Sequence, residues 1–159
     1  MKGTEFKIPN FGELLGSHLG AVPTAAYPYL LSQLERTAAD RYRGWAKDVP
    51  EHAEGLLACA ESEDEIADRV EAMFPPSEEH RALVKSIIPE AKATYYSVFE
   101  SYTPVQQMTI QADAERQGAG AWQNLKAVHP DRADELDALS EIELSSAGYL
   151  NALLPTLLE

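Results

Sequence analysis

The sequence predicts an all-α fold, an antiparallel bundle of five long helices preceded by a short N-terminal helix. Apolar residues recur at steps of three and four along most of the chain, which is the helical period. Strand signals are nearly absent, since the β-prone segment 94–99 lies within a helical period. The ten prolines fall mostly where helices would begin or end.

Six helices are expected in order, and capping residues mark several of their ends. They cover about residues 11–19, 24–47, 50–74, 78–102, 104–128 and 131–154. The clearest start is Thr103, because Gln106 completes the pattern of a capping box. Ser77 is the expected N-cap of the fourth helix, and Pro89 is expected to kink that helix. The last helix is expected to end where Pro155 begins.

Two other helix starts have weaker signals. Thr24 is the expected N-cap of the second helix, and Asp48 with Glu51 is expected to cap the third. The whole chain, residues 1–159, is expected to form one domain, with the short helix at about 11–19 and the bundle at about 24–155. Short loops between long helices predict antiparallel neighbours.

Composition excludes several classes of function. The chain has 13 basic and 26 acidic residues and a net charge of −13, which disfavours binding to nucleic acid or to anionic membranes. A single cysteine, Cys59, excludes a disulfide framework and a multi-cysteine zinc site, and we expect it to be a buried apolar residue. Residues 1–7 lack a following apolar run, and no segment has the length of a membrane span, so we expect a cytoplasmic protein.

Two regions suggest contacts with a partner. Segment 51–80 holds ten acids and one base, opposite a basic stretch on the second helix. This pattern predicts a solvated acidic face beside a basic neighbour, or alternatively a surface that recognises a basic partner or a cation. The last segment, 150–158, is strongly apolar and favours dimerisation or docking. The short first helix is expected to dock on its own bundle or on a partner.

The most informative pattern is the presence of acids within the apolar stripes of the helices. Four long helices each place one glutamate there, near the middle of the helix: Glu35, Glu63, Glu115 and Glu143. An unpaired carboxylate is costly to bury, so these groups must be neutralised, paired or bound to a cation.

With segments 114–119 (AERQGA) and 141–147 (EIELSSA), this helix order resembles the ferritin-like and rubrerythrin-like four-helix bundles. In that superfamily, one Glu from each of two helices and a Glu-x-x-His motif on each of the other two hold a dimetal centre. The resemblance covers about residues 24–155, with the fourth helix as an insertion. It implies a ferritin-like topology, a dimetal centre of Fe or Mn, and the ligands Glu35, Glu63, Glu115 and Glu143.

The chain departs from that pattern because it contains no Glu-x-x-His. Ile66 stands three residues after Glu63, and Ser146 stands three residues after Glu143. An all-carboxylate site suits hard cations such as Mg²⁺ or Mn²⁺ better than redox iron. In the alternative without metal, the glutamates flank the core and pair with arginines, for which the candidates are Arg36, Arg41, Arg69 and Arg116.

Three interpretations of function follow. The first is a non-catalytic binding or assembly module without a cofactor, which forms a homo-oligomer or binds a protein through the apolar C-terminal helix or the acidic face. The second is a ferritin-like metal-binding protein or oxidoreductase that uses the four glutamates. The third is a bundle that binds a small ligand without metal, in a pocket lined by aromatic residues. No residue is assigned a catalytic role.

Overall fold

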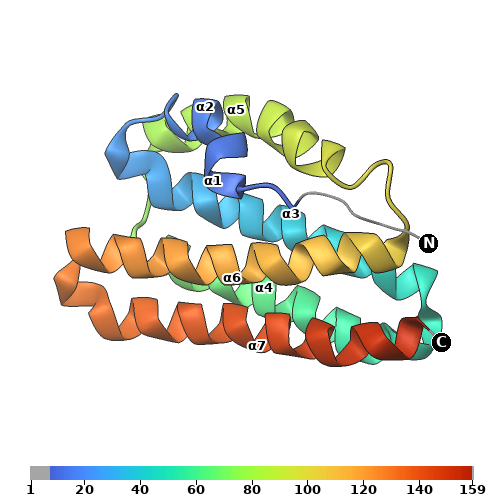
Figure 1. Ribbon diagram of the computed structural model, residues 1–159. Helices are drawn as coiled ribbons and strands as arrows, with labels where there is room; N and C mark the ends of the chain where they lie inside the picture. The colour runs from blue at the N-terminus through green and yellow to red at the C-terminus, as the bar shows by residue number, and fades with distance from the viewer. Residues whose placement is uncertain (1–7, 159) are drawn as a thin grey trace.

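The computed structural model describes residues 8–158 and confirms the all-α prediction (Figure 1). The expectation that the chain has no leader signal concerns residues 1–7, which lie outside the described residues. The five long helices are α3 (Tyr27–Asp48), α4 (Ala53–Met73), α5 (Glu78–Ser97), α6 (Pro104–Val128) and α7 (Ala133–Leu157). The expected N-terminal helix is instead two short ones, α1 (Phe11–Leu14) and α2 (Gly16–Leu19), which meet at Leu15.

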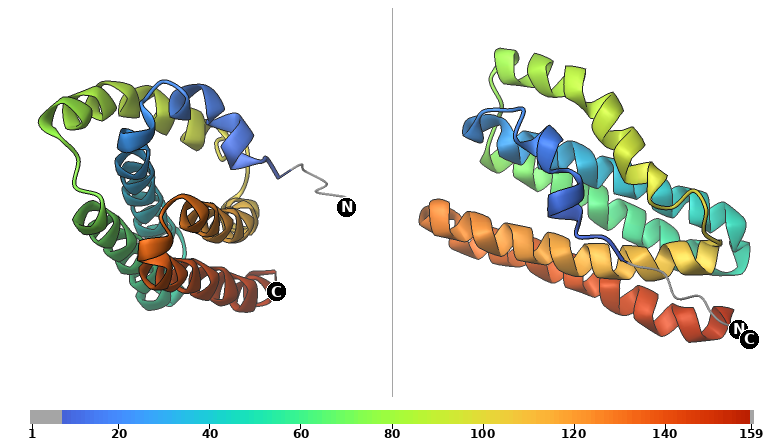
Figure 2. Two further views of the ribbon diagram at one scale, coloured as in Figure 1. Left: turned by 90° about the vertical axis from the view of Figure 1, so that its left-hand side faces the viewer. Right: turned by 45° about the horizontal axis from the view of Figure 1, so that its top comes forward.

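Two helical hairpins form the bundle. α3 packs along α4, and α6 packs along α7, each pair joined by a short 3₁₀ turn. α4 also contacts α7, whereas α3 and α6 make hardly any close backbone contact. α5 crosses from one hairpin to the other on the outside of α3, and α1 and α2 lie across the gap between α3 and α6 (Figure 2).

Several helix ends match the predicted capping residues. The side chain of Thr103 accepts from the Gln106 amide, and Gln106 accepts from the Thr103 amide, which is a complete capping box. Ser77 caps α5 as predicted. α5 contains Pro89 and bends along its length (Figure 2), which agrees with the expected kink.

Other predicted ends are wrong. α3 begins at Tyr27 after a 3₁₀ turn, and neither it nor α4 has a side-chain N-cap. α7 runs to Leu157 with Pro155 inside its last turn. A proline there removes one hydrogen bond, and the carbonyl left without a partner belongs to Asn151, which is exposed and can bind water. α5 ends at Ser97, about five residues before the predicted position, because turns follow it.

The described residues form three apolar clusters, and two of them lie along the bundle, one toward each end. The first is rich in aromatic residues and includes Tyr42, Trp45 and Phe99, which stack edge to face. The second gathers aliphatic residues of α4 and α7 around Trp122. The predicted burial of Cys59 is confirmed, and Tyr42, Trp45, Phe99 and Trp122 are buried as well.

The two chain ends are packed against this bundle. Phe11 of α1 is buried in the aromatic core, so the first helix docks on its own chain. In the apolar C-terminal segment, Leu150 and Leu153 are buried in the same core, whereas Leu158 is exposed. Much of the apolar character of this segment is therefore used within the chain. No helix among residues 8–158 has both the length and the apolar character needed to cross a membrane.

Candidate metal centre

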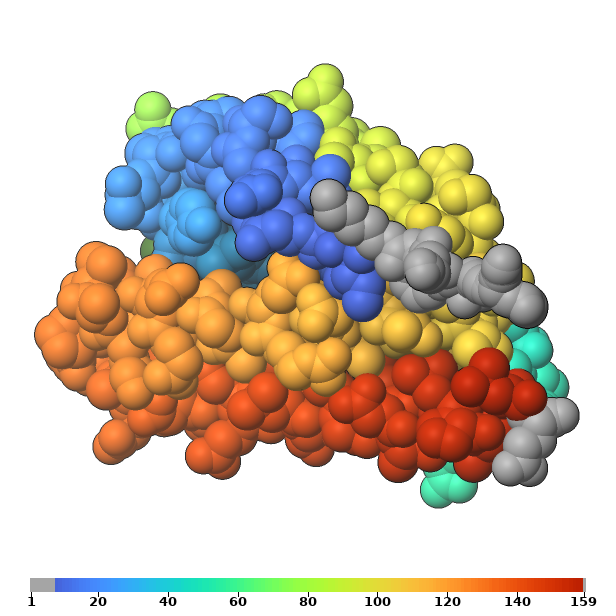
Figure 3. Space-filling model, in the orientation of Figure 1, coloured from blue at the N-terminus to red at the C-terminus, as the bar shows by residue number. Residues whose placement is uncertain are grey.

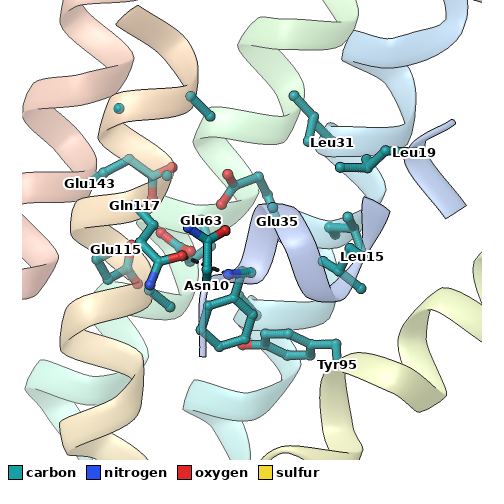
Figure 4. Close-up of a pocket in the computed structure, with 18 of the residues that line it drawn as sticks. Asn10, Leu15, Leu19, Leu31, Glu35, Glu63, Tyr95, Glu115, Gln117 and Glu143 are labelled. Atoms are coloured by element: carbon teal, nitrogen blue, oxygen red, sulfur yellow. Dashed lines mark hydrogen bonds between the residues drawn. The ribbon is translucent and has the colours of Figure 1, made fainter. Parts of the chain in front are cut away.

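The four predicted glutamates form a polar layer between the two apolar cores. Each comes from a different long helix: Glu35 from α3, Glu63 from α4, Glu115 from α6 and Glu143 from α7. Figure 4 shows their carboxyl groups turned toward a common point. Three of the residues are only 1% exposed, and Glu35 is half-buried. We call these four residues the inner cluster.

Three members of the inner cluster are close enough to share one ion. Glu35, Glu63 and Glu143 each offer a carboxylate oxygen, and these three oxygens lie within 4.8 Å of one another. Oxygen ligands lie at about 2.0–2.6 Å from Mg²⁺ or Ca²⁺, so two ligands on opposite sides of one ion are about 4–5 Å apart. The three oxygens therefore have the spacing of a single coordination sphere.

Glu115 is held beside this group by neutral donors. The Tyr42 hydroxyl donates to Glu115 Oε2 at 2.5 Å, and the Gln111 amide donates to the same oxygen at 3.1 Å. Tyr95 in turn donates to Gln111 Oε1 at 2.7 Å, which fixes the direction of that amide. The other carboxylate oxygen, Glu115 Oε1, is buried and has no hydrogen-bond partner among the described residues.

Glu143 is positioned by one donor and by one missing side chain. The Trp122 ring N–H donates to Glu143 Oε2 at 2.8 Å. Gly118 faces the same carboxyl group, and a Cβ at that position would lie 2.5 Å from Glu143 Oε2. That contact is too short, so the glycine provides the space that the Glu143 carboxyl group occupies.

No basic side chain among residues 8–158 pairs with the inner cluster, so the predicted pairing with arginines is wrong. Arg69 and Arg116 each pair with an acid one turn earlier on their own helix. Arg41 donates to Gln107 and stacks on aromatic rings. Among the described residues, Glu63 Oε2 is also buried without a hydrogen-bond partner.

The fourth candidate, Arg36, belongs to a second group on a more exposed side of α3 and α4. We call this group the outer cluster, and its members are Arg36, Arg43, Asp64, Asp68 and Glu71. The Arg36 guanidinium lies 2.8 Å from Asp68, 3.2 Å from Glu71 and 3.5 Å from Asp64. Arg43 pairs with Asp64 as well. These contacts support the interpretation that acids of segment 51–80 form a solvated face beside a basic helix.

The environment of the inner cluster favours protonated carboxyl groups. Burial raises the pKa of Glu35 from 4.5 to about 7, with the charge of Glu115 adding to the rise, although hydrogen bonds to Glu143 and Glu63 oppose it. Burial, together with the neighbouring carboxylates, also raises the pKa of Glu63 and that of Glu143 well above the usual value. Protons and metal ions should therefore compete for these carboxyl groups.

The donor set of the layer consists of oxygen atoms. Ile66 and Ser146, at the positions where Glu-x-x-His would place imidazoles, are both buried in the packed bundle. No histidine lines the adjoining cavity. This absence of imidazole agrees with the sequence and favours hard cations over softer ones.

A cavity of about 460 Å³ opens beside the inner cluster, between α3 and α6. All four glutamates line it, and α1 and α2 form one of its walls. Figure 3 shows the same face of the molecule, which is hollowed between the N-terminal segment in blue and α6 in orange. The layer is thus buried in the bundle and still adjoins a space that opens to solvent.

Sequence reasoning identified the four carboxylates but not the residues that position them. Gln111 could have been found, because it lies one turn before Glu115 on the same face of α6. The donors Tyr42 and Trp122 fit their helices' apolar stripes, and only the fold shows which oxygen each one reaches. Gly118 could not have been found from the sequence, because its role depends on the Glu143 side chain from another helix.

Comparison with known proteins adds no functional assignment. No protein-family model, no curated protein and no solved structure matches this chain.

Proposed function

We propose that this protein binds divalent, oxygen-preferring metal ions at the inner cluster. Glu35, Glu63 and Glu143 would hold the first ion, and Glu115 lies beside them. The observation that carries the proposal is that four carboxyl groups meet inside the bundle, and no basic side chain in the described part of the chain pairs with them. A metal ion supplies the positive charge that the described residues do not.

The free oxygens of the layer support the same proposal. Glu63 Oε2 and Glu115 Oε1 are buried and accept no hydrogen bond in the described residues. A buried carboxylate oxygen without a partner is costly, and cation coordination removes that cost. The hydrogen bonds from Tyr42 and Trp122 each bind one oxygen of a carboxyl group and so orient it, as outer groups commonly do around metal ligands.

The all-oxygen donor set favours Mn²⁺ or Mg²⁺ as the ion, with Fe²⁺ as a weaker candidate. Two divalent ions would balance four carboxylates, whereas one ion would leave Glu115 and one further negative charge. The chain order of the ligands and the crossing of α5 between the hairpins support a ferritin-like arrangement. An oxidoreductase activity and a role in assembly remain separate predictions, and the proposal of metal binding does not depend on them.

The test is the metal content of the untagged protein, purified without chelators and then incubated with Mn²⁺. We expect one to two ions per chain, measured by inductively coupled plasma mass spectrometry and by calorimetric titration. Glu63→Gln and Glu143→Gln should each weaken Mn²⁺ binding by about 100-fold, because each removes a charged ligand.

The matched control is Asp64→Asn, which neutralises the next residue of α4 but in the outer cluster. It should leave Mn²⁺ binding unchanged. Less than about a tenth of an ion per chain under all conditions would overturn the proposal, as would equal loss of Mn²⁺ binding in the Asp64 and Glu63 variants.

A further inference from the structure

We propose that the cavity beside the inner cluster binds a small, uncharged and largely apolar organic molecule. This inference rests on the proposed function, because a bound metal ion would neutralise the carboxylates at one end of the cavity. The cavity volume of about 460 Å³ lies within the range of pockets that hold small organic ligands, roughly 300–1,000 Å³.

The walls of the cavity are mostly apolar. α1 and α2 contribute one wall and α3 another, and the leucines of these walls are Leu15, Leu19, Leu31 and Leu34. On the α6 side, Ala114, Ala121 and two glycines leave the space open. Burial of apolar surface would therefore supply most of the binding free energy.

The two glutamine amides on the cavity wall, those of Gln111 and Gln117, already have partners within the protein. Asn10 Oδ1 accepts from the Glu13 amide and caps α1. Gln117 accepts from the Phe11 amide at 2.8 Å and donates to the Pro9 carbonyl at 2.9 Å, and so fixes the N-terminal wall. The two glutamines have little capacity left for a ligand, and among the described residues Asn10 Nδ2 and the Asn124 side chain are the amide groups still open to one. A molecule with many polar groups would therefore lose hydrogen bonds to water on entering.

The cavity offers an anionic ligand no basic side chain from residues 8–158. Its described lining includes four glutamates and no lysine, arginine or histidine. A carboxylate or phosphate ligand would meet at best a site neutralised by metal, and it would gain no hydrogen bond from a basic side chain. An uncharged molecule avoids this repulsion and matches the apolar walls.

Three probes of equal chain length and different charge test the inference: 1-octanol, octanoate and octylammonium. Binding to the Mn²⁺-loaded protein is measured by titration calorimetry. We expect 1-octanol to bind, and we expect the affinity for octanoate to be lower by about tenfold or more. Octylammonium should also bind the loaded protein more weakly than 1-octanol does, because the carboxylates are already neutralised.

The matched variants are Gly120→Leu and Gly148→Leu, which place a leucine at two exposed helical glycines with open space around them. Gly120 lines the cavity, and Gly148 does not. Gly120→Leu should weaken 1-octanol binding by about tenfold or more and leave the Mn²⁺ stoichiometry unchanged. Gly148→Leu should change neither property, and circular dichroism should show both variants folded.

The outcomes separate this inference from the proposed function. Mn²⁺ binding without 1-octanol binding, or tighter binding of octanoate than of 1-octanol, would overturn the inference and leave the metal centre intact. If the protein takes up no Mn²⁺, the proposed function fails, and the same probes are compared on the metal-free protein. Preference for octylammonium there would overturn the inference, and preference for 1-octanol that is lost in Gly120→Leu would support it.

Discussion

The inner and outer clusters share two helices, α3 and α4, where their residues are adjacent in sequence, and their charges are balanced in different ways. Glu35 precedes Arg36 in α3, and Glu63 precedes Asp64 in α4. In the outer cluster, half-exposed acids meet two arginines. In the inner cluster, the partners that residues 8–158 give the buried acids are one another and neutral donors such as Tyr42.

The comparison shows that a basic residue can be adjacent in sequence to a buried acid without pairing with it. Arg36 follows Glu35 directly but pairs with acids of the outer cluster. Neighbouring residues differ by about 100° around a helix axis, so Arg36 points away when Glu35 points inward. Water screens the outer charges, whereas the inner charges lie in a medium of low polarity. Changes to the two clusters should therefore differ in size, in pH dependence and in response to metal.

The largest expected effect is that a metal ion bound at the inner cluster stabilises the folded protein. At free Mn²⁺ about 1,000 times its Kd, the free energy of unfolding should rise by about 4 kcal/mol, because the ion binds the folded chain alone. Urea denaturation with and without Mn²⁺ measures the rise. Glu63→Gln should lose most of it, and Asp64→Asn should keep it. An equal rise in all three proteins would show that Mn²⁺ acts elsewhere.

The next effect is the pH dependence of the metal-free protein. Glu35 has a pKa of about 7 in the folded chain against 4.5 as the ordinary value. Between these values the folded chain holds a proton that the unfolded chain has lost, so stability is full below about pH 4.5 and falls as pH rises through about 7. The difference corresponds to roughly 3 kcal/mol.

Comparison of the wild type with Glu35→Gln at pH 5 and pH 8 isolates this contribution. The variant should be the more stable protein at pH 8, and its advantage should shrink toward pH 5. A wild type whose stability relative to the variant rises with pH would contradict the prediction, since it would mean that the folded chain favours charged Glu35.

A smaller effect is expected from Gly118→Ala. The added Cβ would lie 2.5 Å from Glu143 Oε2, so the carboxyl group must move and Mn²⁺ affinity should fall by roughly tenfold. Gly148→Ala is the control, because its Cβ meets open space, and it should stabilise the helix by up to about 1 kcal/mol. Calorimetric titration measures the affinity. Equal Mn²⁺ affinity in the two variants would show that the Glu143 carboxyl group can move away from the added Cβ without losing its role as a ligand.

The smallest effect belongs to the outer cluster. Arg36→Gln should destabilise the protein by about 1 kcal/mol or less, because exposed ion pairs contribute little and are screened by salt. The difference from wild type should shrink in about 1 M salt, which thermal denaturation can follow. Mn²⁺ binding should not change. A loss of several kcal/mol would mean that the outer acids are more strongly coupled to the fold than their exposure indicates.

Much of this structure could be predicted because it depends on local patterns. The capping box at Thr103 and the apolar stripes fixed α6 and the inward direction of its glutamate. The end of α7 could not be read from Pro155, because the cost of a proline depends on whether water reaches the freed carbonyl. The role of Gly118 was likewise hidden, since it depends on a side chain from another helix.

The polar layer also determines how the four helices can align. The inner cluster has an apolar core on either side along the bundle axis. If one helix slid by a turn, about 5.4 Å, its glutamate would enter an apolar core, and an aliphatic residue would face the remaining carboxyl groups. Apolar packing alone tolerates many such shifted arrangements. The four glutamates thus favour one register of the helices along the bundle axis, although their burial costs the protein stability.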